Sequence, residues 1–159
     1  MAASGQTLIG TSNAALAASG TKTTHEIAAG SASLIRINRV RVSQITHKTS
    51  EQYTLQGQRI TTTGTGTSTT PLQDEPQSAA LGAARIGTCK TADSVEPTYT
   101  ASTIVLQPGW NSLTGRDIVN PPGKELYISP SAILGLACVT PASTTNFSPV
   151  TEAFFEVLG

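Results

Sequence analysis

The residues that could carry out metal or redox chemistry in this chain are few. The sequence holds two histidines, His25 and His47, and two cysteines, Cys89 and Cys138. Neither histidine has metal-type partners at a suitable spacing, and the cysteines form no Cys-x-x-Cys pair, whereas a zinc site needs several such ligands. We therefore expect no metal and no cofactor. The two cysteines could pair with each other or could equally be buried and reduced.

The acidic residues that could act as general acids or bases are scattered. Asp74 and Glu75 lie in one expected loop, Asp93 and Glu96 in another, and Asp117 in a third. Acid–base catalysis needs groups held in a specific geometry, and no spacing in the sequence predicts one. No Gly-x-Ser-x-Gly elbow is present either. We expect that the protein is not an enzyme. The alternative is a small hydrolase in which Asp74, Asp93 and Asp117 converge only in the folded chain.

The segment 64–70, Gly-Thr-Gly-Thr-Ser-Thr-Thr, has glycine spacing similar to that of loops that cradle a phosphate. A P-loop also needs Gly-Lys-Ser/Thr after its glycines, because the lysine reaches the phosphates, and this segment has no lysine. We expect an extended loop between two strands that contacts another subunit. Gly64, Thr65, Gly66 and Thr67 are therefore candidate interface residues.

The main basic concentration lies in the segment 33–43, Ser-Leu-Ile-Arg-Ile-Asn-Arg-Val-Arg-Val-Ser. Apolar and polar residues alternate there, and the alternation changes phase after Asn38, which predicts a strand with a β-bulge near Asn38-Arg39. The phase change would place Arg36 and Arg39 on opposite sides of the strand. We expect Arg36, Arg39 and Arg41 to form ion pairs with neighbours or to lie at an oligomer interface. No aromatic residues are interleaved with them for stacking on nucleic-acid bases.

The single tryptophan, Trp110, directly follows a Pro-Gly turn. A tryptophan in this position is most often buried near the end of a sheet, where its large ring fills the core. The alternative is an exposed ring at an interface, so Trp110 is also a candidate interface residue.

The charge of the chain limits its partners. Ten Lys and Arg residues balance ten Asp and Glu residues among the 159 residues, so the net charge is zero. A neutral chain has no overall attraction to nucleic acids or acidic membranes. No run approaches the roughly 18 apolar residues of a membrane helix, and the N-terminus lacks the basic start of a signal peptide. We expect a soluble protein made in a cytoplasm that binds neither nucleic acid nor membrane.

Short strand-like segments between turns rich in Gly and Pro dominate the rest of the sequence. We expect strands at about 33–43, 51–62, 102–106, 113–119, 125–129, 133–139 and 150–157. The first two should form a long hairpin, and 133–139 should be central because it is continuously apolar. This pattern predicts an all-β fold, an antiparallel β-sandwich that is jelly-roll-like and carries long loops.

The N-terminal residues differ in composition from the rest. Residues 1–32 are rich in Ala, Ser, Gly and Thr, which predicts an N-terminal arm with a possible edge strand at 21–27. Residues 33–159 are then the β-sandwich domain. Short helical turns are possible at 13–18 and 76–84.

The order of several motifs resembles that of a known class of proteins. The motifs are 34–43, 50–56 (Ser-Glu-Gln-Tyr-Thr-Leu-Gln), 64–67, 78–80, 96–100 (Glu-Pro-Thr-Tyr-Thr), Trp110-Asn111 and 134–136 (Leu-Gly-Leu). This order resembles that of small virion proteins of tailed bacteriophages, most of all the capsid decoration, or cement, proteins with a β-sandwich body. The resemblance covers about residue 33 to the C-terminus.

The resemblance implies a structural role on the virion capsid surface. Such proteins typically form trimers at threefold axes of the head, where they bridge subunits of the major capsid protein, and they carry no active site. The alternative is a tail- or fibre-associated module that binds a host-surface glycan, for which Trp110, Tyr99 and Tyr127 are the candidate stacking residues.

Overall fold

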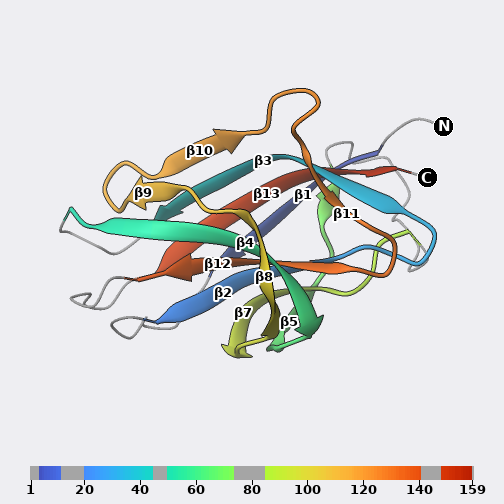
Figure 1. Ribbon diagram of the computed structural model, residues 1–159, viewed down its shortest axis with the longest axis horizontal. Coiled ribbons are helices and arrows are strands. Elements are labelled where there is room, and N and C mark those ends of the chain that lie inside the picture. The colour runs from blue at the N-terminus through green and yellow to red at the C-terminus, as the bar shows by residue number, and fades with distance from the viewer. Residues whose placement is uncertain (1–3, 12–19, 45–49, 74–84, 141–147, 159) are drawn as a thin grey trace.

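Two antiparallel β-sheets pack face to face around a shared core (Figure 1). The computed structural model describes residues 4–11, 20–44, 50–73, 85–140 and 148–158, and contains no helix within these ranges. The predicted all-β, antiparallel sandwich is therefore confirmed. The finer expectation of a jelly-roll-like strand order stays a prediction. Over the described ranges, there is also no helix long and apolar enough to cross a membrane.

The first sheet has six strands. Its order is β10 (Arg116–Val119), β3 (Leu34–Gln44), β13 (Pro149–Leu158), β1 (Ser4–Thr11) and β6 (Leu72–Gln73), with β11 (Leu126–Ile128) paired to the other half of β3. Strands β3, β13 and β1 run side by side as one layer in Figure 1.

The second sheet has seven strands. Its order is β5 (Thr65–Thr69), β7 (Cys89–Val95), β2 (Thr21–Ala28), β12 (Ile133–Val139), β4 (Gln52–Thr62) and β8 (Thr98–Leu106), with β9 (Gly109–Asn111) paired to β4. Strand β12 pairs with β2 on one side and β4 on the other, so its predicted central position is confirmed.

Two predictions about strand neighbours are wrong. The segments 33–43 and 51–62 do not form a hairpin, because β3 belongs to the six-stranded sheet and β4 to the seven-stranded sheet. Each strand turns its apolar side chains into the same core from the opposite layer. The segment 21–27 is not an edge strand either, because β2 lies between β7 and β12.

The segment expected to be an arm contributes strands to the interior of both sheets. Strand β1 pairs with β13 and β6, and β2 occupies the middle of the other sheet. Composition misled this prediction, because Thr, which is frequent in β2, suits a packed strand as well as an extended arm. The helical turns expected at 13–18 and 76–84 lie outside the described residues.

A β-bulge at Asn38 shapes the first sheet as predicted. In the pairing of β3 with β13, Phe154 lies opposite Arg39 and Phe155 lies opposite Ile37, so Asn38 is the extra residue. A bulge takes up one residue and restores the alternation of side chains beyond it. The strand therefore buries apolar residues on both sides of the bulge: Ile35, Ile37, Val40 and Val42.

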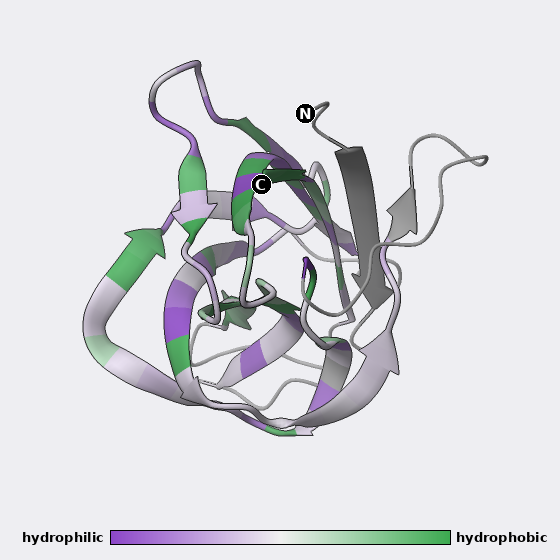
Figure 2. Cartoon of the chain, turned by 90° about the vertical axis from the view of Figure 1, so that its right-hand side faces the viewer, coloured by the Kyte–Doolittle hydropathy of each residue, from purple (hydrophilic) through white to green (hydrophobic). Residues whose placement is uncertain are grey.

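The core lies between the sheets and draws on both of them. Its members include Ile27 from β2, Leu55 from β4, Leu136 from β12 and Phe155 from β13. Viewed from the side in Figure 2, the strands surround a common interior, and apolar and polar residues alternate along several of them. The sandwich is thus stabilised mainly by apolar burial across the two layers.

Neighbouring phenylalanines on β13 provide a matched test of this core. Phe155 is 1% exposed, whereas Phe154 points outward and lies under the Arg39 guanidinium. We expect Phe155→Ala to lower the free energy of unfolding by about 3–5 kcal/mol. Phe154→Ala should cost less than about 1.5 kcal/mol, since it removes a half-buried ring and one cation–π contact. Urea unfolding of both variants measures this, and equal losses would contradict the assigned faces.

A chain of polar groups crosses the core between the sheets. His25 on β2 is fully buried, and its Nδ1 lies 2.5 Å from Thr151 Oγ1 on β13. The Thr151 hydroxyl donates to Thr24 Oγ1 at 2.7 Å, and the Thr24 hydroxyl donates to the Leu136 carbonyl at 2.9 Å. This chain fits a neutral His25 that carries its proton on Nδ1. Burial lowers the pKa of His25 from 6.5 to about 3.

The buried His25 should make the protein less stable in acid. The unfolded chain binds a proton on His25 below pH 6.5, while the folded chain resists protonation down to about pH 3. The stability from neutral His25 is therefore complete above pH 6.5 and decreases as the pH falls toward 3. Between pH 7 and pH 5 the free energy of unfolding should drop by roughly 1–2 kcal/mol more in the wild type than in His25→Gln. Urea titrations at both pH values test this, and parallel pH profiles would contradict it.

Candidate functional site

The three arginines of β3 lie together on the outer face of the six-stranded sheet. Arg36 pairs with Glu156, Arg39 with Asp117, and Arg41 with Glu152, the last at 3.0 Å. The expectation that these arginines form ion pairs with neighbours is confirmed. The expectation that Arg36 and Arg39 lie on opposite sides is wrong, because the bulge at Asn38 absorbs the change of phase.

The ion pairs on this face leave its charges balanced. Each of the three guanidiniums has a carboxylate partner on the neighbouring strand, and the hydrogen bond from Arg39 lowers the pKa of Asp117. Exposed pairs of this kind contribute little to stability. Their effect is to make the face nearly neutral, so that it offers arginine stems and aromatic surface instead of net charge.

A groove of about 650 Å³ runs along the same face. It is lined by Arg36, Asn38, Arg39, Val119, Asn120, Pro122, Glu125 and Phe154. The Arg39 guanidinium lies 5.2 Å from the centre of the Phe154 ring. Val119 is 65% exposed, and Tyr127, which is hydrogen-bonded to Arg36, is 49% exposed. Exposed apolar residues grouped around a groove are typical of interaction surfaces.

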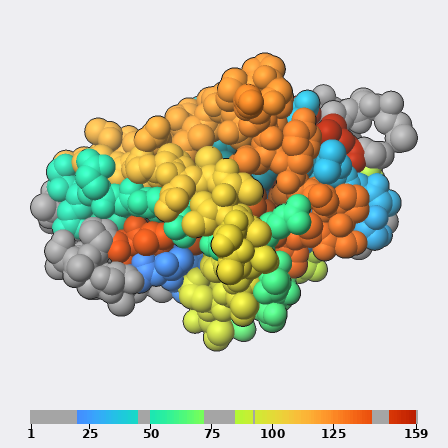
Figure 3. Space-filling view, in the orientation of Figure 1, coloured from blue at the N-terminus to red at the C-terminus, as the bar shows by residue number. Residues whose placement is uncertain are grey.

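The groove lies beside a raised part of the molecule. In Figure 3, β10, β11 and the turn between them (orange) form the upper part of the visible face. This turn contains Pro121, Pro122 and Gly123, and its backbone is closed by a hydrogen bond from the Lys124 N–H to the Pro121 carbonyl. The exposed apolar side chains of this region are therefore held on short paired strands and a closed turn.

The Gly/Thr segment differs from its prediction, because most of it is a strand. Strand β5 pairs with β7, with Thr67 opposite Thr91 and Thr69 opposite Cys89. Gly64 is buried, and its N–H donates to Glu26 Oε1 at 2.6 Å. The expected loop at 64–70 is therefore wrong: Gly64 is a packing residue, while Thr65 and Thr67 are exposed.

The glycines of this segment are required by a close approach to Asp93. A Cβ on Gly66 would lie 2.1 Å from Asp93 Oδ1, and one on Gly64 would lie 2.3 Å from the Val95 carbonyl oxygen. No side chain fits at those distances. The two glycines therefore let the backbone lie directly on β7 and on the Asp93 carboxyl, instead of cradling a ligand.

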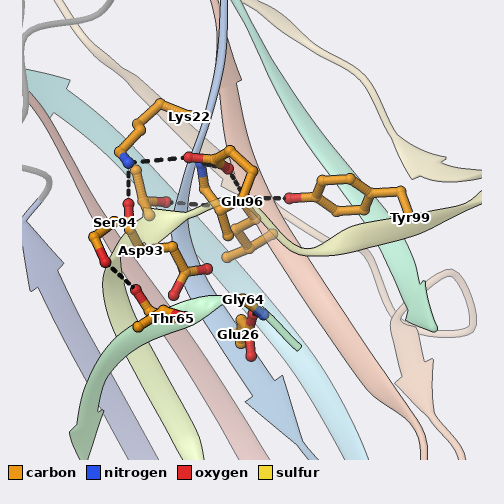
Figure 4. A network of polar contacts seen from close by, with 11 residues as sticks. Lys22, Glu26, Gly64, Thr65, Asp93, Ser94, Glu96 and Tyr99 are labelled. Atoms are coloured by element: carbon orange, nitrogen blue, oxygen red, sulfur yellow. Dashed lines mark hydrogen bonds and ion pairs between the residues drawn. The ribbon is translucent and has the colours of Figure 1, made fainter. Parts of the chain in front are cut away.

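A cluster of carboxyl groups lies beneath this segment (Figure 4). Glu26 is fully buried and Asp93 is 1% exposed. Burial, followed by the nearby charge of Glu26, raises the pKa of Asp93 to about 7. Lys22 lies 3.0 Å from Glu96, and Lys90 lies 3.8 Å from Glu26. Sequence reasoning missed Glu26, since its surroundings are set by Gly64, Asp93 and Lys90, which lie far from it in the sequence.

The carboxylates of the hydrolase alternative do not converge where they are described. Asp93 lies on β7 of one sheet and Asp117 on β10 of the other, while Asp74 lies outside the described residues. Across the described ranges, no group of three or more His, Cys, Asp or Glu residues is arranged to hold a metal ion. Cys89 and Cys138 are buried free thiols, which agrees with the second of the two cysteine alternatives.

The aromatic candidates are mostly inside the molecule. Trp110 is 2% exposed and packs on Tyr53 with ring centroids 5.3 Å apart. Its interpretation as a core residue is therefore confirmed, and its assignment to an interface is wrong. Tyr99 lies 2.5 Å from the Thr23 hydroxyl, and burial raises its pKa. Of the three proposed stacking residues, Tyr127 is the exposed one.

Comparison of the chain with protein-family models, with curated proteins and with solved structures gives no match.

The contact between Gly66 and Asp93 can be tested by a single methyl group. Gly66→Ala would place a Cβ against Asp93 Oδ1 and the Thr91 carbonyl oxygen, so one strand must move. We expect a loss of about 1–3 kcal/mol in the free energy of unfolding. The control is Thr67→Ala in the same strand, where the side chain is exposed and the loss should stay within about 0.5 kcal/mol. If Gly66→Ala were as stable as this control, the close approach would be incorrect.

Proposed function

We propose that this protein decorates and stabilises a bacteriophage capsid by bridging subunits of the major capsid protein, and that it acts as a trimer on the capsid surface. The observation that carries this proposal is the exposed apolar surface of Val119 and Tyr127 beside the groove on the six-stranded sheet. The motif order, which resembles that of decoration proteins, supports the same class.

The chemistry of this surface suits a protein partner. Its arginines are already paired with Glu156, Asp117 and Glu152, so a partner meets aromatic and aliphatic surface with little charge to desolvate. Phe154, stacked beneath Arg39, gives the groove an apolar floor. A contact of modest strength that is repeated over a symmetric shell gains affinity from its multiplicity.

The distribution of reactive groups favours binding over catalysis. His25, Cys89, Cys138 and Asp93 are all buried, and the groove is lined by none of them. A catalytic group must reach its substrate, so these residues support the core in this proposal.

Shell binding is the direct test of the docking surface. Purified protein should bind undecorated shells of the parent phage and raise their melting temperature, while binding isolated coat subunits weakly. We expect Val119→Ser to weaken shell binding by about tenfold, since it removes an exposed apolar contact at the groove. The matched control is Val105→Ser on β8 of the other sheet, where valine is 48% exposed and its loss should leave binding unchanged.

Two results would contradict the proposal. One is saturating binding that leaves the melting of the shell unchanged. The other is an equal loss of binding in both valine variants, which would remove the groove from the interface. Light scattering of the purified protein checks the oligomer, for which we expect the mass of a trimer.

A second candidate function is recognition of a glycan on the host surface. It is favoured by the exposed Tyr127 ring, which lies opposite Arg36 at the groove, and by the amides and the carboxylate that the groove contains, since an aromatic face with amides and a carboxylate suits a sugar. A glycan array that gives hits abolished by Tyr127→Ala would favour this function over decoration. An array without hits would exclude it for the glycans tested.

A further inference from the structure

Strand β5 forms an edge of the seven-stranded sheet and depends on β7 for its pairing. It is hydrogen-bonded to β7 on one side, with a register shift between Thr65 and Thr67. Beneath the start of β5 lies the Asp93 carboxyl, which Figure 4 shows directed toward Gly64 and Glu26. Anything that changes the charge of Asp93 therefore acts directly on the contact between β5 and the sheet.

The charges that face Asp93 balance only when one carboxyl group is neutral. These groups are Glu26 and Lys22 from β2, Lys90 from β7, Glu96 from the turn after β7, and Tyr99 from β8. Strand β5 itself contributes no titratable side chain. Two lysines offset two carboxylates, so a third ionised carboxylate would leave one buried negative charge without compensation.

Hydrogen bonding also requires a proton in this cluster. With every carboxyl group ionised, both oxygens of Asp93 and Oε2 of Glu26 lack a hydrogen-bond donor among the described residues. A carboxylic acid can donate to a neighbouring carboxylate, and a hydrogen bond between Asp93 and Glu26 is one of the causes that raise the pKa of Asp93. A single proton on the pair thus replaces the repulsion between two carboxylates with a hydrogen bond.

The other contacts of β5 converge on the same pair. Glu26 Oε1 accepts from the Gly64 N–H at 2.6 Å, and Lys90 Nζ donates to the Gly64 carbonyl at 2.7 Å. At the far side, the Ser94 hydroxyl donates to the Thr65 carbonyl at 2.8 Å. Gly64, the residue before β5, is thus attached to Glu26 directly, and Gly66 within β5 lies against the Asp93 carboxyl.

We propose that Glu26 and Asp93 form a proton-controlled latch for β5: the strand closes over the pair while it holds a proton, and separates from β7 when that proton is lost. Separation leaves the edge of β7 without its partner, and such an edge accepts an extended segment of another chain. This inference is independent of the docking groove, which lies on the other sheet.

The direction of the pH dependence follows from the raised pKa of Asp93. An open strand returns water to Asp93, so the open state binds the proton less tightly than the closed state. Closure is therefore most favoured below the ordinary carboxyl pKa of 3.8 and weakens as the pH rises toward about 7, where the closed state also loses the proton. Above that value the opening equilibrium no longer changes with pH.

Hydrogen exchange of the full-length protein measures this opening. After correction for intrinsic exchange rates, protection of the β5 amides should fall by about tenfold or more between pH 5 and pH 7, and then level off. The central strand β12 should keep its protection over the same range. Protection of β5 that is independent of pH would overturn the proposal.

Matched variants identify the group responsible. In Asp93→Asn the side chain stays neutral, so β5 protection should no longer vary with pH. Asp117→Asn changes the same residue type on the other sheet and should keep the wild-type profile. If Asp93→Asn fails to fold, Glu26→Gln removes the neighbouring negative charge that raises the pKa of Asp93, and should move the loss of protection to lower pH or suppress it. A wild-type profile in folded Asp93→Asn, or in Glu26→Gln when Asp93→Asn does not fold, would refute the latch.

Discussion

The arrangement of the seven-stranded sheet depends on the burial of both faces of β2. Six consecutive residues, Thr23 to Ala28, are buried, although four of them are polar or charged. A strand without a solvent face must satisfy its polar groups inside the protein, because an unpaired buried group costs free energy. On the core side His25 joins a chain of hydroxyl groups across to β13. On the outer side Glu26 is enclosed by Gly64, Asp93 and Lys90.

The other sheet has an outer face that is exposed but carries little net charge. The bulge at Asn38 brings Arg36, Arg39 and Arg41 onto one face, and β10 and β13 supply their carboxylate partners. The result is a surface with arginine stems, Phe154 and exposed apolar residues, and with little net charge. In our proposals the two sheets therefore have different roles. The outer face of the six-stranded sheet is the docking surface, and the β5 edge of the seven-stranded sheet responds to protonation.

The His25 network and the Glu26–Asp93 carboxyl pair respond to acid in opposite directions. Neutral His25 favours the folded state above its ordinary pKa, whereas a protonated Asp93 favours closure of β5 below about pH 7. The first concerns the bridge between the sheets and therefore the whole fold. The second concerns an edge strand, so its effect is local. Burial is the largest cause of both pKa shifts. The position of each group in the fold therefore decides whether its effect is local or concerns the whole protein.

The sequence alone determined the class of the fold, the bulge at Asn38 and the central position of 133–139. These properties follow from alternation and continuous apolarity along single strands, which are local patterns. Only the tertiary structure decided that β3 and β4 lie in different sheets, that β2 is interior and that the Gly/Thr segment is a strand. It also brought Glu26, Asp93 and Gly66 together from three separate strands. Alternation predicts which side chains share a face of a strand, but what covers that face is set by segments distant in sequence, so neither the carboxyl pair nor the groove could be read from spacing.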